Sequence, residues 1–131
     1  MIATLVRARL IALGLVTAGT GNGSGWVCLI GGLSDAIAAP QVAVLDTAGL
    51  PPLMSHGSGR PLRPGLQVLV RGLPNTYAAT AAKAEAVFEG LHRTSWGALQ
   101  TVEAVNNPIW VGYEPDTSAP VWSINFLTIL T

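Results

Sequence analysis

A stretch rich in proline and glycine, residues 50–64, constrains the fold of this chain more than any other part of the sequence. It holds Pro51, Pro52, Pro61, Pro64, Gly57, Gly59, Ser55 and Ser58. Proline fixes φ and lacks a backbone donor, and glycine favours turns, so helix and strand are both disfavoured here. A loop of this length in a compact domain is functional or disordered. We therefore expect residues 47–64 to form an extended arm between two strands.

The apolar pattern on both sides of this arm predicts an α+β fold. Apolar side chains recur at steps of three and four over residues 2–16, which predicts a helix, and a glycine-rich linker follows at 19–25. Asn75 stands where a second helix, ending near His92, needs its N-cap. Alternating or short apolar runs predict strands at 26–30, 41–46, 66–72, 98–105, 109–113 and 121–130. This order predicts a mixed β-sheet with two helices packed on one face.

The chain is apolar and carries few charges. Its 131 residues suit a single domain, 1–131. Hydrophobic residues make up 50% and charged residues 11%, against about 25% charged in typical soluble domains. Such a composition indicates either a membrane protein or a subunit whose surface neighbours cover. The apolar run at 10–16 is far shorter than the roughly 18 residues that span a bilayer, so covering by neighbours is favoured.

The charge balance argues against nucleic acid as a specific partner. Seven basic residues face seven acidic ones, and the basic residues form no stripe along the sequence. A neutral, apolar chain tends to self-associate, because little repulsion keeps its copies apart. We therefore expect oligomers of this chain, with neither a specific nucleic acid nor a membrane as partner.

The first residues weakly imitate a signal peptide, because a short apolar run follows two arginines. Arg7 and Arg9, however, lie inside an apolar run that already begins at Ile2, and residues 17–19 make a poor cleavage site. We expect no cleaved signal, and a secreted binding domain stands as an alternative. Cys28, the one cysteine, is expected to be a small buried apolar residue.

No residue pattern indicates catalysis, and we expect neither an enzyme nor a bound cofactor or metal. The sequence has no nucleophile elbow, zinc-protease helix, paired-cysteine motif or phosphate-binding lysine motif. His56 lies in the arm, and His92 lies at a helix end, where the helix dipole accounts for it. Glu114 and Asp116 are placed to bind a cation or, as the favoured interpretation, to form a solvated hairpin tip.

Residues that contact other subunits are expected in the arm, on one strand and on one turn. Arg71 at a strand end either extends to water or forms an ion pair between subunits, since arginine suits partly buried pairing. The acidic residues available for such a pair include Glu85, Glu89, Glu103 and Asp116. The interface candidates are Arg71, Arg60, Arg63, Leu53, Met54, His56, Asp116 and Glu114.

Several short segments resemble the tail terminator and minor capsid proteins of long-tailed bacteriophages. Segment 66–72 (LQVLVRG) is similar to the family's strand with a V-x-V-R pattern. Segment 75–92 begins with NTYA and ends with VFEGLH, like the family's helix that ends in an L-x-x-L-H type signature. Segments 108–109 (PI) and 122–126 (WSINF) resemble its closing part, and 41–47 (QVAVLDT) with the arm resembles its first half.

This resemblance implies a structural virion protein of the phage tail or neck, assembled in the host cytoplasm. The family forms a ring, usually a homohexamer, on the head-proximal end of the tail tube. There it stops tube polymerisation and joins the tail to the head-completion complex. The implied partners are copies of the chain itself, the tail tube protein and a head-completion or connector protein. The turn at 117–120 departs from the family pattern, which leaves a head-completion or connector (neck) subunit as the alternative.

Overall fold

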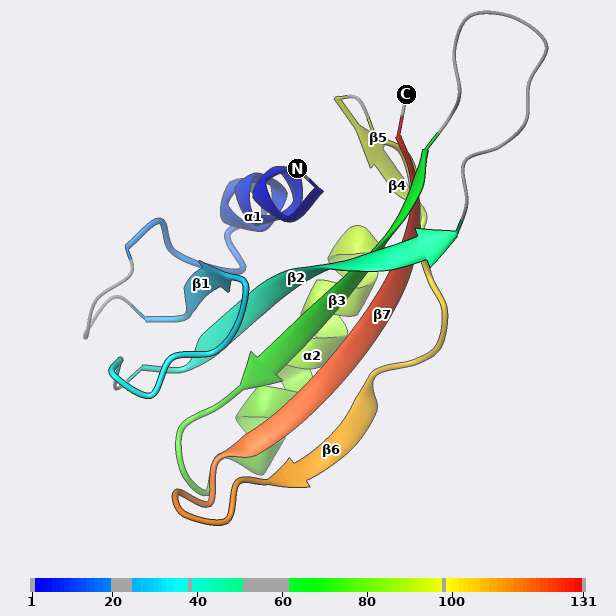
Figure 1. The fold of residues 1–131 in the computed structure, drawn as a ribbon. Coiled ribbons are helices and arrows are strands. Elements are labelled where there is room, and N and C mark those ends of the chain that lie inside the picture. The colour runs from blue at the N-terminus through cyan, green and yellow to red at the C-terminus, as the bar shows by residue number, and fades with distance from the viewer. Residues whose placement is uncertain (1, 20–24, 38, 51–61, 98, 131) are drawn as a thin grey trace, which may run out of the picture.

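The computed structural model describes residues 2–19, 25–37, 39–50, 62–97 and 99–130. Two helices and seven strands follow one another along the chain (Figure 1). In order they are α1 (Ile2–Ala12), β1 (Val27–Ile30), β2 (Gln41–Leu50), β3 (Arg63–Arg71), α2 (Tyr77–Leu91), β4 (Thr94–Trp96), β5 (Leu99–Ala104), β6 (Ile109–Tyr113) and β7 (Pro120–Leu130).

The strands form one mixed sheet that curves into a half-barrel, which confirms the α+β class. Its order is β1-β2-β3-β7-β5-β4, with β6 paired to β7 outside this path. β1 runs parallel to β2, and every other pairing is antiparallel. Because β7 is long, it pairs with β6 along its first half and with β5 along its second half. Strands β6 and β5 therefore lie at opposite ends of β7.

The centre of the sheet is built from the alternating apolar residues of β3 and β7. Register places Leu66 opposite Phe126 and Val68 opposite Ile124, and all four side chains are buried. The prediction that Leu66, Val68 and Val70 share one face agrees with their common burial, since side chains alternate across a strand. At about 25 cal/mol per Å² of apolar area removed from water, these large side chains supply much of the free energy of folding.

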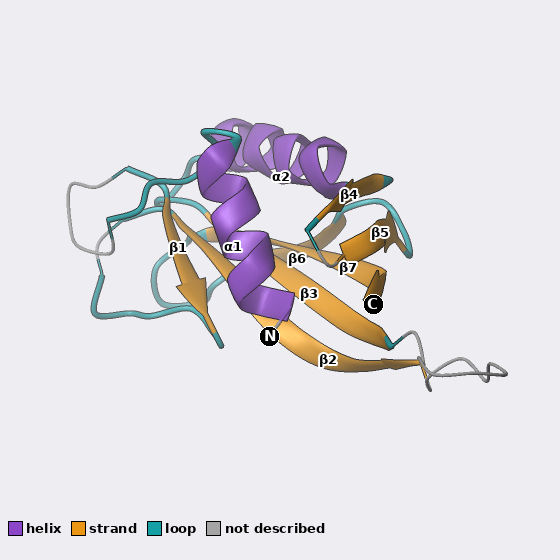
Figure 2. Ribbon diagram, turned by 90° about the horizontal axis from the view of Figure 1, so that it is seen from above, coloured by secondary structure: helices purple, strands orange, loops and turns teal. Residues whose placement is uncertain are grey.

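Both helices pack their apolar residues against this sheet. α1 contacts β1, β2 and β3, whereas α2 contacts β7, β3 and β5. One hydrophobic core joins Val6 and Leu10 of α1 to Val87 and Leu91 of α2 through the strands. In Figure 2 the two helices are drawn on the same side of the strands.

The helix ends differ from the prediction at two places. α1 ends at Ala12 rather than near Val16, because Gly14 takes a left-handed φ of 75° that breaks the helix. Asn75 is not the N-cap of α2: it also has a positive φ (60°), and Thr76 holds the cap position without a side-chain capping bond. The hydroxyl of Thr76 instead donates to the carbonyl of Leu73.

The strands flanking the predicted arm are longer than expected. β2 continues through the predicted turn to Leu50, and β3 begins at Arg63, so the bounds 47–64 were too wide at both ends. The β2–β3 register shifts between Thr47 and Leu50, where Gly49 has a φ of +66°. A Cβ on Gly49 would collide with the backbone of residues 63–65. Residues 51–61 of the arm lie outside the described residues.

Candidate interaction surface

Strand β6 forms an outer edge of the sheet. It pairs with β7 on one side, and among the described residues no strand and no hydrogen bond engages its other side. The segment Ile109–Tyr113 contains no charged residue. Its apolar side chains are largely exposed: Ile109 42%, Trp110 38%, Val111 59% and Tyr113 52%. An uncharged edge with open backbone groups is a template for pairing with another chain.

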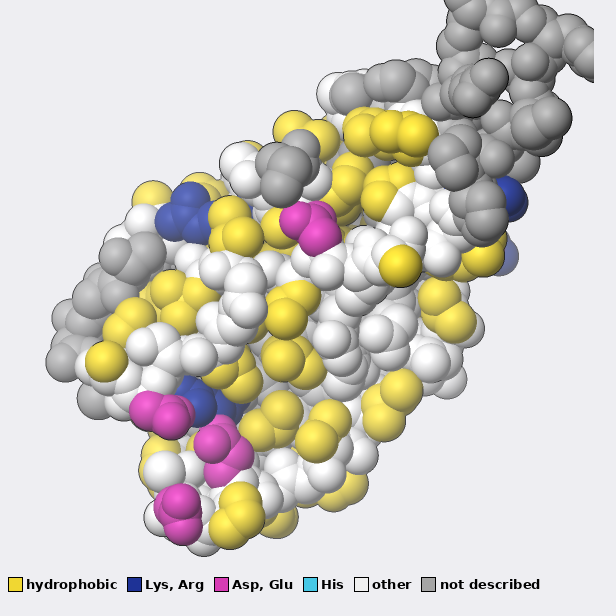
Figure 3. Space-filling view, in the orientation of Figure 1, with side chains coloured by type: hydrophobic (Ala, Val, Ile, Leu, Met, Phe, Trp, Pro, Cys, Tyr) yellow, Lys and Arg dark blue, Asp and Glu magenta, His cyan; other side chains and the backbone are white. Residues whose placement is uncertain are grey.

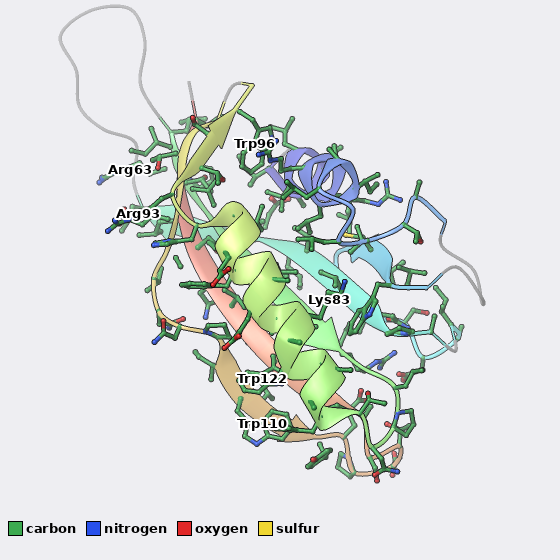
Figure 4. The ribbon with its side chains drawn as sticks, turned by 180° about the vertical axis from the view of Figure 1, so that it is seen from behind. Arg63, Lys83, Arg93, Trp96, Trp110 and Trp122 are labelled. Carbon is green, nitrogen blue, oxygen red and sulfur yellow. The ribbon has the colours of Figure 1, made fainter. Side chains whose placement is uncertain are left out.

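Aromatic rings hold this edge strand in place. Trp110 packs edge-on against Tyr77 at the start of α2, with ring centroids 5.0 Å apart. It also contacts Trp122 of β7 at 5.2 Å and Tyr113 at 5.1 Å. Figure 4 shows Trp110 and Trp122 side by side near one end of α2. Such pairs contribute about 0.5–1.5 kcal/mol each beyond their buried area, so β6 presents a fixed apolar surface.

The edge at β1 is covered, in contrast to β6. In a parallel pair every second residue directs its backbone groups away from the partner strand, and Cys28 is such a residue. Its carbonyl accepts a hydrogen bond from Nε of Arg7 at 3.1 Å. The carbonyl of Trp26, just before β1, accepts one from the backbone N–H of Thr17 at 2.8 Å. Side chain and backbone from the α1 region thus occupy this edge.

The thiol of Cys28 lies in the hydrophobic core, on the face of β1 that α1 covers. The side chain is buried, as the sequence predicts, and burial raises its pKa to about 11, an effect that the nearby Arg7 partly offsets. A thiol with so high a pKa is a poor nucleophile at neutral pH. The remaining outer strand, β4, has only three residues, and short strands are one way in which proteins protect an edge.

Arg71 lies at the centre of an ionic cluster within the chain. Its Nη1 donates to Oδ1 of Asp35 at 2.7 Å and to Oε1 of Glu114 at 3.0 Å. Its Nη2 donates to the carbonyl of Ser34 at 2.7 Å. The cluster ties the loop before β2 to the turn between β6 and β7, and so fixes the end of β6.

The expectation that Arg71 extends to water is therefore wrong, since its side chain is only 10% exposed. The ion pair between subunits, with Glu85, Glu89, Glu103 or Asp116, stays a prediction, and within the chain Arg71 pairs with Asp35 and Glu114. The pairing with Asp35 joins residues 36 apart in the sequence, and neither helical nor strand periodicity brings them together.

The other interface candidates fall into three groups. Glu114 belongs to the Arg71 cluster, and Asp116 lies exposed in the same turn. Arg63 begins β3 at the opposite end of the sheet. The candidates Arg60, Leu53, Met54 and His56 lie outside the described residues.

Three residues that matter to this surface were missed. Trp110 stands in an uncharged apolar strand, and that signal was available in the sequence. Arg93 follows His92, the C-cap of α2, has a left-handed φ of 57° and lies exposed at the same end as Arg63 (Figure 4). Asp35 lies in an irregular loop, where no pattern marks it.

The face of the sheet turned away from the core carries neutral side chains along its middle, with Arg71 towards one end and Glu103 towards the other. Figure 3 shows mostly apolar and neutral side chains over β2, β3 and β7. By register, this face includes the half-buried Leu29, Leu45, Gln67, Leu69, Asn125, Leu127 and Ile129. Neutral faces of this kind lose little solvation energy when another surface covers them.

A hollow of about 360 Å³ lies between α2, β7 and the segment before β6, and its lining includes Phe88, Trp122, Glu85 and Glu89. Nδ1 of His92 accepts a hydrogen bond from the backbone N–H of Ala104, and its ring stacks on Phe88. Among the described residues, no three metal-binding side chains converge, and no helix is long and apolar enough to cross a membrane.

No protein-family model matches the sequence, and no curated protein matches it. The likeness to phage tail terminators therefore rests on the short motifs described above. Four of these occupy regular elements: 41–47 lies in β2, 66–71 lies in β3, 77–91 is α2, and 122–126 lies in β7.

Proposed function

We propose that this chain is a structural assembly subunit of a bacteriophage virion. In this proposal it forms a ring, a homohexamer by family likeness, at the head-proximal end of the tail tube. The ring stops tube polymerisation and joins the tail to the head-completion complex. The observation that carries the assembly role is the uncharged, exposed edge of β6, which is fixed by aromatic packing but paired on one side only.

An edge of this kind favours assembly for a physical reason. Its outward N–H and C=O groups gain partners when a strand from another chain is added, and its apolar side chains leave water. The scarcity of charge elsewhere and the net charge of zero lower the repulsion between copies. Together these properties support a subunit that works inside an assembly.

The proposal assigns different roles to the two faces of the sheet. The two helices cover one face, where they enclose the core. The opposite, nearly neutral face and the arm between β2 and β3 are left for neighbouring subunits and for the tail tube. The motifs in β3, α2 and β7 that resemble tail terminators all lie in the elements that build the core and the edge.

Tube length measures this function directly. The purified protein is added to the tail tube protein of the same virion during polymerisation, and tube lengths are measured by negative-stain electron microscopy. We expect shorter tubes with a ring density on one end. Unchanged tubes, together with binding to the connector complex, would instead support the alternative of a neck subunit.

A further inference from the structure

Three aromatic side chains form an exposed patch beside the open edge of β6. This aromatic patch consists of Tyr77 at the start of α2 and of Trp110 and Tyr113 in β6, which are 45%, 38% and 52% exposed. Trp110 lies between the two tyrosines, whose rings pack against it at centroid distances of 5.0 and 5.1 Å. Because the rings meet at 75° and 82°, they form an uneven apolar surface rather than a flat stack.

Each ring of the aromatic patch also carries an unused hydrogen-bond donor. Within the described part of the chain, no hydrogen bond engages the hydroxyls of Tyr77 and Tyr113 or the indole N–H of Trp110. A ligand that covers these groups displaces their water, and a donor buried without a new partner destabilises the complex. A ligand suited to the patch therefore combines apolar groups with exposed hydrogen-bond acceptors.

A proline-rich segment combines these two properties. A polyproline II helix makes no internal hydrogen bonds, so its carbonyls are open to donors, and its rings pack in aromatic-lined grooves. Proline also has a fixed φ, so such a segment loses little conformational freedom on binding. The chain itself contains a segment of this kind at 50–53, with the sequence LPPL and without a charged residue.

This segment lies far from the aromatic patch of its own chain. Leu50, the last residue of β2, pairs with Arg63, whereas Trp110 pairs with Trp122. Arg63 is seven residues of strand away from the position on β3 opposite Trp122, which corresponds to roughly 23 Å. Figure 4 shows Arg63 and Trp110 towards opposite ends of the molecule. Pro52 follows Leu50 by two residues, or about 7 Å of extended chain, which is too short to span this distance.

From these observations we infer that residues 50–53 of one copy dock on the aromatic patch of a neighbouring copy. The inference rests on the proposed function and names one contact of its ring. A second copy is the fitting occupant, because every chain supplies one such segment and one such patch, and neither brings a charge that would need a partner. Segment and patch are different surfaces, so the contact is heterologous and closes into a ring when the rotation allows it.

Two variants separate the two sides of this contact. The arm variant, Pro51→Ala with Pro52→Ala, changes the segment and keeps the patch. The patch variant, Tyr113→Ala, removes one exposed ring and keeps the segment. We expect each to assemble roughly tenfold or more weakly than the wild type, since tyrosine and well-ordered groups dominate contacts of this kind. Leu13→Ala truncates an apolar side chain that is 40% exposed outside the patch, and this matched control should assemble normally.

Mixing the arm variant with the patch variant gives a signature that a non-specific defect does not. The patch variant still carries an intact segment, and the arm variant still carries an intact patch. One contact can therefore form between the two chains, but the ring cannot continue from it. We expect native mass spectrometry of the mixture to show more heterodimer than homodimer of either variant.

A synthetic peptide of residues 48–55 tests the recognition without assembly. The peptide contains no aromatic residue, so the tryptophan emission of the protein reports its binding. We expect saturable binding to the arm variant, whose patch is free. Binding should weaken roughly tenfold or more when the peptide itself carries Pro51→Ala and Pro52→Ala, or when the protein also carries Tyr113→Ala.

Circular dichroism establishes that each variant is folded, and the outcomes are then distinct. An arm variant that assembles like the wild type would overturn the inference, as would equal binding of the two peptides. An equal loss of assembly in Leu13→Ala would also overturn it. A wild type that stays monomeric contradicts the proposed function itself, whereas a wild-type assembly that both variants retain overturns the inference alone.

Discussion

The strands β1 and β6 are both outer strands with apolar sequences, yet their edges differ. Along β1, the α1 region covers the edge: Arg7 binds the carbonyl of Cys28, and Thr17 binds the carbonyl of Trp26. Along β6, no described residue covers the edge, and the side chains from Ile109 to Tyr113 lie largely in solvent. Apolar composition alone therefore does not identify a docking edge. A docking edge is identified by whether its outward N–H and C=O groups already have hydrogen-bond partners.

The largest expected effect comes from placing a charge on the open edge. Val111→Lys should weaken self-association by about 3 kcal/mol, over a hundredfold, because the ammonium must lose water in the contact. The same change at Ile30 of β1, which is 50% exposed, is the matched control and should leave association unchanged. Sedimentation velocity over a concentration series measures both. An Ile30→Lys variant that dissociates while Val111→Lys does not would reverse the comparison.

The burial of Cys28 predicts that its thiol is alkylated slowly. With a pKa of about 11 in place of 9.0, Cys28 holds roughly 100-fold less thiolate at pH 8 than an ordinary cysteine. We expect alkylation by iodoacetamide to be slower by at least that factor in the folded chain. Rapid labelling of the native protein would show that the Cys28 side chain is not buried.

The same thiol gives the chain a pH dependence with a defined sign. Because folding raises the pKa, the neutral thiol's contribution to stability is fully present below pH 9.0 and is lost as the pH rises towards about 11. The free energy of unfolding, measured with urea at a series of pH values, should therefore fall more steeply with pH in the wild type than in Cys28→Ala over this window. Parallel curves would contradict the assignment.

Removing the anchor of the β6–β7 turn should have the next largest effect. Arg71→Ala deletes hydrogen bonds to Asp35, Glu114 and Ser34, and we expect a loss of about 2 kcal/mol in the free energy of unfolding. The two carboxylates can regain water, which limits the loss. Arg71→Lys keeps the charge but not the planar donor group, so its free energy of unfolding should lie between those of the wild type and Arg71→Ala. Thermal and urea unfolding of the wild type and both variants measure these losses. An Arg71→Ala variant as stable as the wild type would show that the cluster does not hold the turn.

Uncovering β1 should have the smallest effect. Arg7→Met retains an apolar stem but loses the hydrogen bonds to Cys28 and Ala18, at a cost of about 1 kcal/mol in unfolding free energy. Its opened edge should also add weak, concentration-dependent association beyond that of the wild type. Unchanged association would mean that β1 is protected by something other than Arg7.

The periodicity of apolar residues predicted which face of each single helix or strand is buried. The alternation in β3 and the stripe of α2 mark their buried faces, because each face meets a continuous core. The short β4 was missed, since three residues with a register shift show no period. The ends of the arm were misplaced because the bulge at Gly49 looks like a turn in the sequence.

The candidate surface was predictable only in part. Asp116 lies exposed in its turn, as a solvated hairpin tip requires, whereas Glu114 is half-buried against Arg71, and Asp35 reaches the same cluster from a distant loop. Whether an edge is covered depends on contacts such as Arg7 with Cys28, 21 residues apart, and these have no signature in the sequence. Such long-range contacts require coordinates.

The central claim is that this chain assembles through the open edge of β6. Native mass spectrometry of the purified wild-type protein over micromolar concentrations at low salt tests it most directly. The account predicts one closed oligomer, with six subunits as the family resemblance implies. A monomer at every concentration, or a continuous ladder of sizes with no closed species, would contradict it.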